Sequence, residues 1–132
     1  MRSLTYLAVL EPSNDGYGVF FPDLPGCIGF GETIPAAQQS AREALELHVY
    51  GMEKDGDVLP VPSQKLSPED TDGCIVTAVT IFPDIVRNEM ENRRVKTNVT
   101  LPLWLKELAE TQKVNYSRLL ENSLLEYLGV KN

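Results

Sequence analysis

Residues 93–132 limit the possible folds most, because they carry more apolar surface than so short a segment can bury alone. Residues 95–101 alternate between apolar and polar side chains, which predicts a β-strand, and two amphipathic helices are predicted to follow, separated at residues 113–115. So small a segment usually needs a metal, disulfides or a partner chain, and its strand has no neighbouring strand. We therefore expect the strand to pair with its copy in a second subunit. The result would be a ribbon-helix-helix (β-α-α) domain that forms a homodimer or a higher oligomer.

Local signals support the two helices. Pro102 suits the first turn of a helix, where its missing N–H is not needed. Asn115 is a favoured N-cap residue, and Gly129 is a favoured C-terminal stop. Apolar side chains, Trp104 among them, recur with helical spacing on one face of each helix. We expect the dimer core to consist of Val99, Leu101, Leu105, Leu108, Leu120 and Leu124.

The polar face of the predicted strand indicates DNA binding. A two-stranded ribbon fits the major groove, where Lys96 can donate to guanine, Asn98 can pair with adenine, and Thr100 can do either. Residues 93–106 contain basic side chains and no acidic ones, which favours double-stranded DNA as a partner. The alternative is a helical dimerisation segment that binds no DNA. Phosphate contacts are expected from Arg94 and Asn115, and from Tyr116 and Ser117 through backbone N–H groups at the start of the second helix.

Charge is divided unevenly along the chain and indicates two domains. The whole chain carries a net charge of −7. Residues 1–86 hold 4 basic and 13 acidic side chains, whereas residues 87–132 hold 8 basic and 6 acidic ones. An acidic body attracts basic proteins and repels nucleic acid. The two parts are therefore expected to bind different partners.

Composition argues against several other classes of protein. Cys27 and Cys74 are too few for a disulfide framework and lack the spacing of metal ligands. We therefore expect reduced thiols, no metal or other cofactor, and a cytoplasmic location. The sequence holds no apolar run of the roughly 18 residues that a membrane span needs, so no membrane partner is expected.

The N-terminal domain, expected over residues 1–82, is predicted to be an α+β layer. Short segments rich in strand-forming residues are separated by turn signals. A long helix follows the third segment, with Thr33 as N-cap and Pro35 in its first turn. Residues 57–72 are predicted to be an irregular, proline-rich loop, and residues 83–92 a linker, with a brief helix as the alternative. The predicted order is β-β-β-α-β on a mainly antiparallel sheet, with strands over 4–11, 17–21, 27–32 and 74–82 and the helix over 34–54.

Three motifs in this domain are similar to those of a known family. They are Gly-Tyr-Gly-Val-Phe-Phe-Pro-Asp-Leu-Pro-Gly-Cys over residues 16–27, Gly-Glu-Thr over 31–33 and Ala-Arg-Glu-Ala-Leu over 41–45. Together they resemble the HicB antitoxins, and the resemblance covers nearly the whole chain. It implies a degraded ribonuclease H-like fold over residues 1–82. Where many relatives have acidic residues after the helix cap, this chain has Ile34-Pro35-Ala36, so toxin contacts there are not carried over.

The same resemblance implies a function and a partner. The partner is the toxin HicA, a small basic ribonuclease that cleaves mRNA. The antitoxin covers the active site of that toxin, and the complex represses its own operon by binding operator DNA. Possible toxin contacts in this chain are Asp15, Asp23 and Glu32, which lie at turns and strand ends. The alternatives are a structural role for Asp23 in its loop and a solvated surface charge at the other two.

Enzymatic activity is not expected of this chain. Two-metal hydrolysis needs several converging carboxylates, and the predicted inner strands over 4–10, 19–21 and 75–82 contain none. His48, the only histidine, falls on the packed face of the predicted helix and has no obvious catalytic partner. The runner-up function is a stand-alone ribbon-helix-helix repressor whose N-terminal domain senses a ligand or oligomerises.

Overall fold

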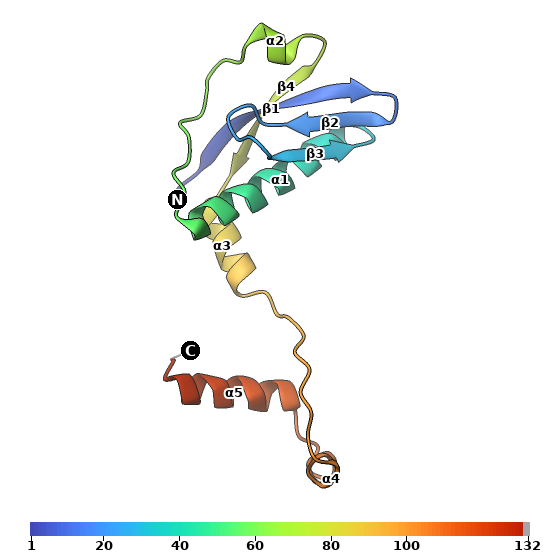
Figure 1. Cartoon of the computed structure of the whole chain (residues 1–132), viewed down its shortest axis with the longest axis vertical. Coiled ribbons are helices and arrows are strands. Elements are labelled where there is room, and N and C mark those ends of the chain that lie inside the picture. Colours follow the sequence, from blue (N-terminus) through green and yellow to red (C-terminus); the bar gives the residue numbers. More distant parts are fainter. Residues whose placement is uncertain (131–132) are drawn as a thin grey trace. The chain divides into compact units, whose positions relative to one another are not determined.

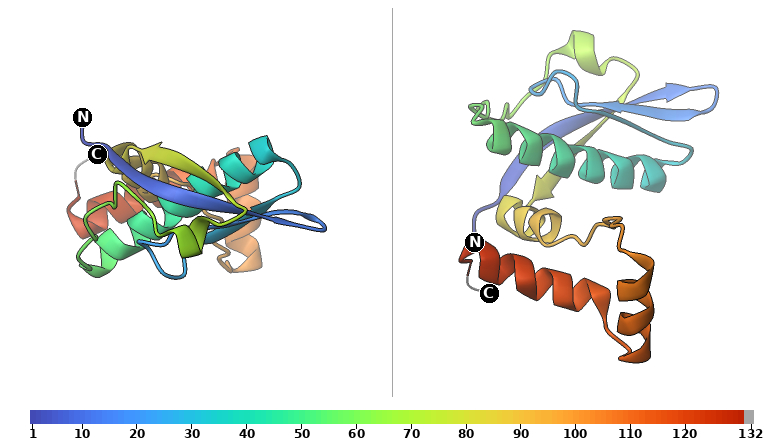
Figure 2. Two further views of the ribbon diagram at one scale, coloured as in Figure 1. Left: turned by 90° about the horizontal axis from the view of Figure 1, so that it is seen from above. Right: turned by 60° about the horizontal axis from the view of Figure 1, so that its bottom comes forward.

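The computed structural model describes residues 1–130. Residues 131 and 132, which close the C-terminal domain predicted over 93–132, lie outside the described residues. The chain forms two compact units, Met1–Arg93 (unit 1) and Arg94–Asn132 (unit 2). Figures 1 and 2 show a sheet covered by a long helix in unit 1 and two helices in unit 2.

Unit 1 is built on a four-stranded antiparallel sheet. Its order is β3-β2-β1-β4, so the hairpin of β1 and β2 lies in the middle and the last strand closes one edge. The predicted α+β class, the antiparallel pairing and the order of three strands, a helix and a strand are confirmed. The strands are β1 (Leu4–Ser13), β2 (Gly16–Phe20), β3 (Ile28–Gly31) and β4 (Ile75–Ile81).

Helix α1 (Ile34–Asp55) lies along one face of this sheet (Figure 1). Its start is capped as predicted, because the Thr33 side chain accepts a hydrogen bond from the Ala36 N–H at 3.2 Å. Its end is Gly56, whose φ of 77° is the left-handed conformation that favours glycine. The core between helix and sheet includes Tyr6, Ala8, Leu10, Val19, Ala37, Ala41, Leu45 and Val49.

The connection from α1 to β4 is held to the rest of unit 1 at two points. The Tyr6 hydroxyl donates a hydrogen bond to the Pro60 carbonyl at 2.6 Å. The Asp23 carboxylate accepts two hydrogen bonds from Ser63. The segment predicted to be an irregular loop contains one short helix, α2 (Pro68–Thr71), which begins with a serine cap and a proline in its first turn.

Residues 83–92, predicted as a linker with a brief helix as the alternative, are helical over most of their length. Residues 83–91 form helix α3 (Pro83–Glu91), which packs against α1 and buries Pro83 and Val86. Asp84 in its first turn pairs with Arg2 at 3.3 Å and with Arg87 at 3.2 Å. So short a helix carries few apolar positions, and its burial depends on α1, which lies far away in the sequence.

Unit 2 contains α4 (Leu103–Thr111) and α5 (Tyr116–Leu128). Both caps predicted for the second of these helices are confirmed. The Asn115 side chain accepts a hydrogen bond at the start of α5, and Gly129, with φ 68°, ends it. Helix α5 therefore begins and ends where its local capping signals predict.

The strand predicted over residues 95–101 is absent from the single chain. Residues 93–102 have no regular secondary structure, and Pro102 serves as the N-cap of α4 instead of lying in its first turn. A β-strand is held by hydrogen bonds to a neighbouring strand, and the described part of unit 2 contains no strand with which residues 95–101 could pair. A ribbon would therefore require a second chain.

Candidate functional site

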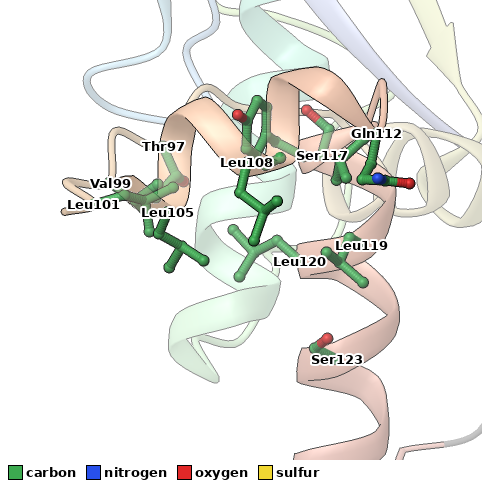
Figure 3. Close-up of a pocket in the computed structure, with 13 residues that line it drawn as sticks. Thr97, Val99, Leu101, Leu105, Leu108, Gln112, Ser117, Leu119, Leu120 and Ser123 are labelled. Carbon is green, nitrogen blue, oxygen red and sulfur yellow. The ribbon is translucent and has the colours of Figure 1, made fainter. Parts of the chain in front are cut away.

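Unit 2 contains an apolar groove formed by residues 97–101, α4 and α5 (Figure 3). We call it the leucine groove, and its volume is about 550 Å³. Figure 3 shows Leu108 of α4 and Leu120 of α5 pointing toward one another across it, with Leu105 beside them. The remaining lining residues are Thr97, Val99, Leu101, Ala109, Gln112, Val114, Tyr116, Ser117, Leu119 and Ser123.

The leucine groove is exposed to solvent. Leu105 is 36%, Leu120 39% and Leu108 54% exposed, and no residue of α4 or α5 is buried. Leucines in a finished hydrophobic core are normally covered by neighbouring side chains. The residues predicted as the dimer core lie together here, since Val99, Leu101, Leu105, Leu108 and Leu120 line the groove and Leu124 lines a neighbouring hollow.

That neighbouring hollow holds two of the three residues predicted to contact DNA bases. Lys96 and Asn98 line it, whereas Thr100 lines neither hollow. Thr97, predicted to face away from Lys96 and Asn98, lines both. Without a paired strand, the predicted alternation of faces is kept only in part.

Arg94, predicted to contact phosphate, forms an ion pair in the single chain. Its Nη2 lies 2.6 Å from the Glu121 Oε1, and the two side chains are 76% and 42% exposed. Exposed ion pairs of this kind contribute only about 0–1 kcal/mol. A phosphate of similar charge can therefore replace Glu121 at little cost.

The other predicted phosphate contacts lie at the N-terminus of α5. The Asn115 Oδ1 accepts a hydrogen bond from the Arg118 N–H at 3.1 Å, so this side chain acts first as a helix cap. The N–H groups of Tyr116 and Ser117 belong to the first turn, where a helix offers no acceptor of its own. These two groups are the donors that an anion at this position would meet.

The three acidic residues predicted to contact a toxin lie in different environments. Asp23 is half-buried, and its carboxylate accepts hydrogen bonds from the Ser63 N–H at 2.7 Å and from the Ser63 hydroxyl at 2.6 Å. Asp15 and Glu32 are exposed, and no ion pair found within residues 1–130 includes them. Asp23 therefore has a structural role, while Asp15 and Glu32 present unneutralised charge.

Neither cysteine shows the features of a reactive thiol site. Cys27 is free and buried, and its burial raises the pKa of the thiol to about 11. Cys74 is free and half-buried. Burial, followed by the nearby charge of Asp23, also raises the pKa of Tyr6. Both shifts follow from packing in the core of unit 1.

Three further findings concern other classes of site. In the part of the chain that the structure describes, no group of three or more His, Cys, Asp or Glu side chains is arranged to hold a metal ion. Nor does any helix within residues 1–130 combine the length and the hydropathy of a membrane span. His48 is half-buried on α1.

Two features of unit 1 were not predicted from the sequence. Ser63, the partner of Asp23, lies 40 residues away along the chain, so no local pattern connects the two. The sheet also carries exposed apolar side chains at Ile28, Phe30 and Val76. Ile28 and Phe30 alternate with glycines along β3, but only the pairing of the strands joins them to Val76 on β4.

Comparison with known proteins places the chain in a family. Residues 6–122 match the family model described as "HicB_like antitoxin of bacterial toxin-antitoxin system". An uncharacterised 14.9 kDa protein of Haemophilus phage HP1 is 33% identical over 105 residues, which cover 77% of this chain and 76% of that protein.

Solved structures have a similar fold. A chain from a toxin-antitoxin complex of Streptococcus pneumoniae has a TM-score of 0.61 at 23% identity, covering 96% of this chain and 99% of that chain. The N-terminal domain of the Burkholderia pseudomallei antitoxin HicB has a TM-score of 0.51 at 27% identity, covering 60% of this chain and 99% of that domain. Since the family model spans most of both units, the chain belongs to the HicB-like antitoxin family of bacterial toxin-antitoxin systems.

Proposed function

We propose that this antitoxin inhibits a small, basic, HicA-type mRNA-cleaving toxin through unit 1 and represses its own operon through unit 2. The observation that carries the proposal is the contrast between the two units. Unit 1 has a closed core and a strongly acidic composition, whereas unit 2 leaves its apolar residues exposed next to basic ones. Such a division suits a protein with one basic protein partner and one nucleic-acid partner.

Inhibition of the toxin would be steric and electrostatic. A ribonuclease that binds RNA needs a basic surface, because its substrate is a polyanion. The acidic unit 1 can compete for that surface, and Asp15 and Glu32 are exposed charges available for the purpose. Asp23 supports the proposal less directly, since Ser63 already occupies its carboxylate.

The leucine groove supports a ribbon-helix-helix dimer. In this arrangement residues 95–101 pair with the same segment of a second chain, and the two sets of groove residues cover each other. Full burial of an exposed leucine contributes roughly 1.5–3 kcal/mol, and Leu105, Leu108 and Leu120, which are 36–54% exposed in the single chain, would gain part of that each on association. The dimer would thus form its shared core only on association.

Operator binding would follow from the same assembly. Pairing of the two strands would turn Lys96, Asn98 and Thr100 outward into the major groove. Arg94, released from Glu121, and the first turn of α5, with Asn115, Tyr116 and Ser117, would then hold phosphates on either side. A two-fold symmetric protein would recognise a two-fold symmetric operator.

A non-enzymatic, degraded ribonuclease H-like unit 1 belongs to the same proposal. Its support is that β4 holds no carboxylate and that the one carboxylate of β1, Glu11, is exposed near the end of that strand. The layer of sheet and helix would then serve as a binding scaffold, without the acidic groups that hold catalytic metal ions.

Co-expression tests the proposal. This chain should be produced with the small basic protein encoded by the adjacent reading frame, with growth and co-purification as readouts. Growth arrest by the neighbour alone, rescue by the pair and a stable complex would support the antitoxin. A neighbour that is harmless or fails to bind would contradict it. A mobility-shift assay with the promoter DNA of the pair tests repression separately.

A further inference from the structure

We propose that the toxin binds unit 1 on the face of the sheet that points away from α1. We call this surface the outer sheet face and define it by Leu7, Val9, Phe20, Ile28, Phe30 and Val76. The inference rests on the proposed function and adds to it the surface that makes the contact. The partner that fits this surface is a basic protein with an apolar patch.

The orientation of these side chains follows from how closely α1 approaches β3. A Cβ added at Gly29 would collide with Ser40 of α1, and one added at Gly31 would collide with the backbone of Ala37. Both glycines therefore face the helix. Because successive residues of a strand point to opposite faces, Ile28 and Phe30 face away from it.

Strand pairing extends this apolar surface across the whole sheet. Val76 of β4 lies opposite Val9 of β1, Val9 lies opposite Phe20 of β2, and Phe20 lies opposite Ile28 of β3. Residues paired in this way stand side by side on one face. One row of apolar side chains thus crosses all four strands.

This row is largely exposed at the two edges of the sheet. Val9 in the middle is fully buried, whereas Val76 is 41% and Ile28 69% exposed. Phe30, next to Ile28 on the same face, is 50% exposed. Exposed apolar side chains that form a contiguous surface commonly mark a protein–protein contact.

Acidic residues lie at one end of this face. β1 ends, β2 begins, β3 ends and β4 begins at the same end of the sheet. Glu11, Asp15 and Glu32 are located there, and Asp70 and Asp72 come just before β4. All five side chains are exposed, and none of them forms an ion pair within residues 1–130.

The charge distribution favours a basic partner over a second copy of the chain. The side chains of the four strands that point away from α1 include Thr5 of β1 and Thr80 of β4. Among them are one acid, Glu11, and no lysine or arginine. Two copies joined through this face would bring like charges into the same interface, which is destabilising. A basic protein would gain attraction at the acidic end and apolar contact along the row.

A matched pair of substitutions in the full chain tests the assignment. Ile28→Lys lies on the outer sheet face, and Leu47→Lys lies on the exposed side of α1, where Leu47 is 61% exposed. Both changes replace an exposed aliphatic side chain by the same cation, so they alter the net charge equally. The probe is the small basic protein of the adjacent reading frame, and the readouts are its Kd, the melting temperature and sedimentation.

We expect Ile28→Lys to weaken toxin binding by about tenfold or more and Leu47→Lys to leave it within about threefold of the parent. Val76→Lys, at the other edge of the row, should behave like Ile28→Lys, and all three variants should melt near the parent. If the parent binds the toxin and both sheet variants bind equally well, the outer sheet face is not the docking surface, although the proposed function stands. A sheet variant that alters only sedimentation would assign this face to self-association instead. If the parent itself fails to bind, the proposed function falls together with this inference.

Discussion

Asp23 and Ser63 connect two loops that lie 40 residues apart in the sequence. One carboxylate oxygen accepts the Ser63 N–H at 2.7 Å, and the other accepts the Ser63 hydroxyl at 2.6 Å. Both oxygens of Asp23 thus serve the fold of unit 1. This pair holds the long connection between α1 and β4 against the Pro22–Gly26 loop.

The first prediction concerns the stability that this pair provides. Asp23→Ala should lower the free energy of unfolding by ~1.5–3 kcal/mol, because it removes hydrogen bonds to a charged acceptor. Ser63→Ala should cost less, since it removes the hydroxyl and keeps the N–H. Urea unfolding of both variants and of the double variant would measure the coupling. Strictly additive losses would show that the two residues do not act together.

The second prediction concerns Cys27 and pH. Burial raises the pKa of this thiol from 9.0 to about 11, so the folded protein holds the proton more tightly than the unfolded chain. The protonated thiol therefore contributes stability that is full below about pH 9 and is lost as the pH rises through about 11. Unfolding free energies of the parent and Cys27→Ala should converge as the pH is raised over this range. A constant difference would contradict the prediction.

Local capping signals explain why α1 and α5 could be predicted from sequence. Thr33, Asn115 and Gly129 each act on the nearest helical turn, so a short window contains the whole cause. The packing of helix α3 could not be predicted in the same way. Burial of Val86 depends on α1, and a pattern within residues 83–92 does not reveal such a contact.

The candidate sites also differ in whether a local pattern or a contact between distant segments determines them. The groove leucines were predicted together because their spacing on α4 and α5 is helical, and the structure brings them to one surface. The strand over residues 95–101 depends on hydrogen bonds that a single chain cannot supply. The outer sheet face was missed because a row such as Val9, Phe20 and Ile28 exists only once the register of the strands is known.

The third prediction concerns the dimer. Leu120→Asp places a charge in the leucine groove, where a second chain would bury it without a partner. The variant should sediment as a monomer at micromolar concentrations at which the parent is a dimer. Leu103→Asp is the matched control, because Leu103 is 70% exposed on α4 and lines neither hollow of unit 2. A Leu120→Asp variant that stays dimeric would refute the ribbon-helix-helix arrangement.

The fourth prediction concerns base recognition. Lys96→Ala or Asn98→Ala should each weaken binding to the operator by ~1–3 kcal/mol, because each removes hydrogen bonds to base edges. Inhibition of the toxin should not change, since both residues belong to unit 2. Lys65→Ala in unit 1 removes the same charge elsewhere and serves as the control in a mobility-shift assay. Loss of inhibition in the Lys96 or Asn98 variant would contradict the division of labour between the units.

The fifth prediction concerns the ion pair between Arg94 and Glu121. Because the two side chains lie 2.6 Å apart, DNA must compete with Glu121 for the guanidinium of Arg94. Glu121→Gln removes this competition and one negative charge, so operator affinity should rise by ~0.5–1 kcal/mol at low salt. Glu126→Gln is the control, because Glu126 is exposed on the same helix and forms no ion pair in the described part of the chain. Adding Arg94→Ala to Glu121→Gln should cancel the gain. If the double variant binds DNA as tightly as Glu121→Gln alone, Arg94 does not contact phosphate.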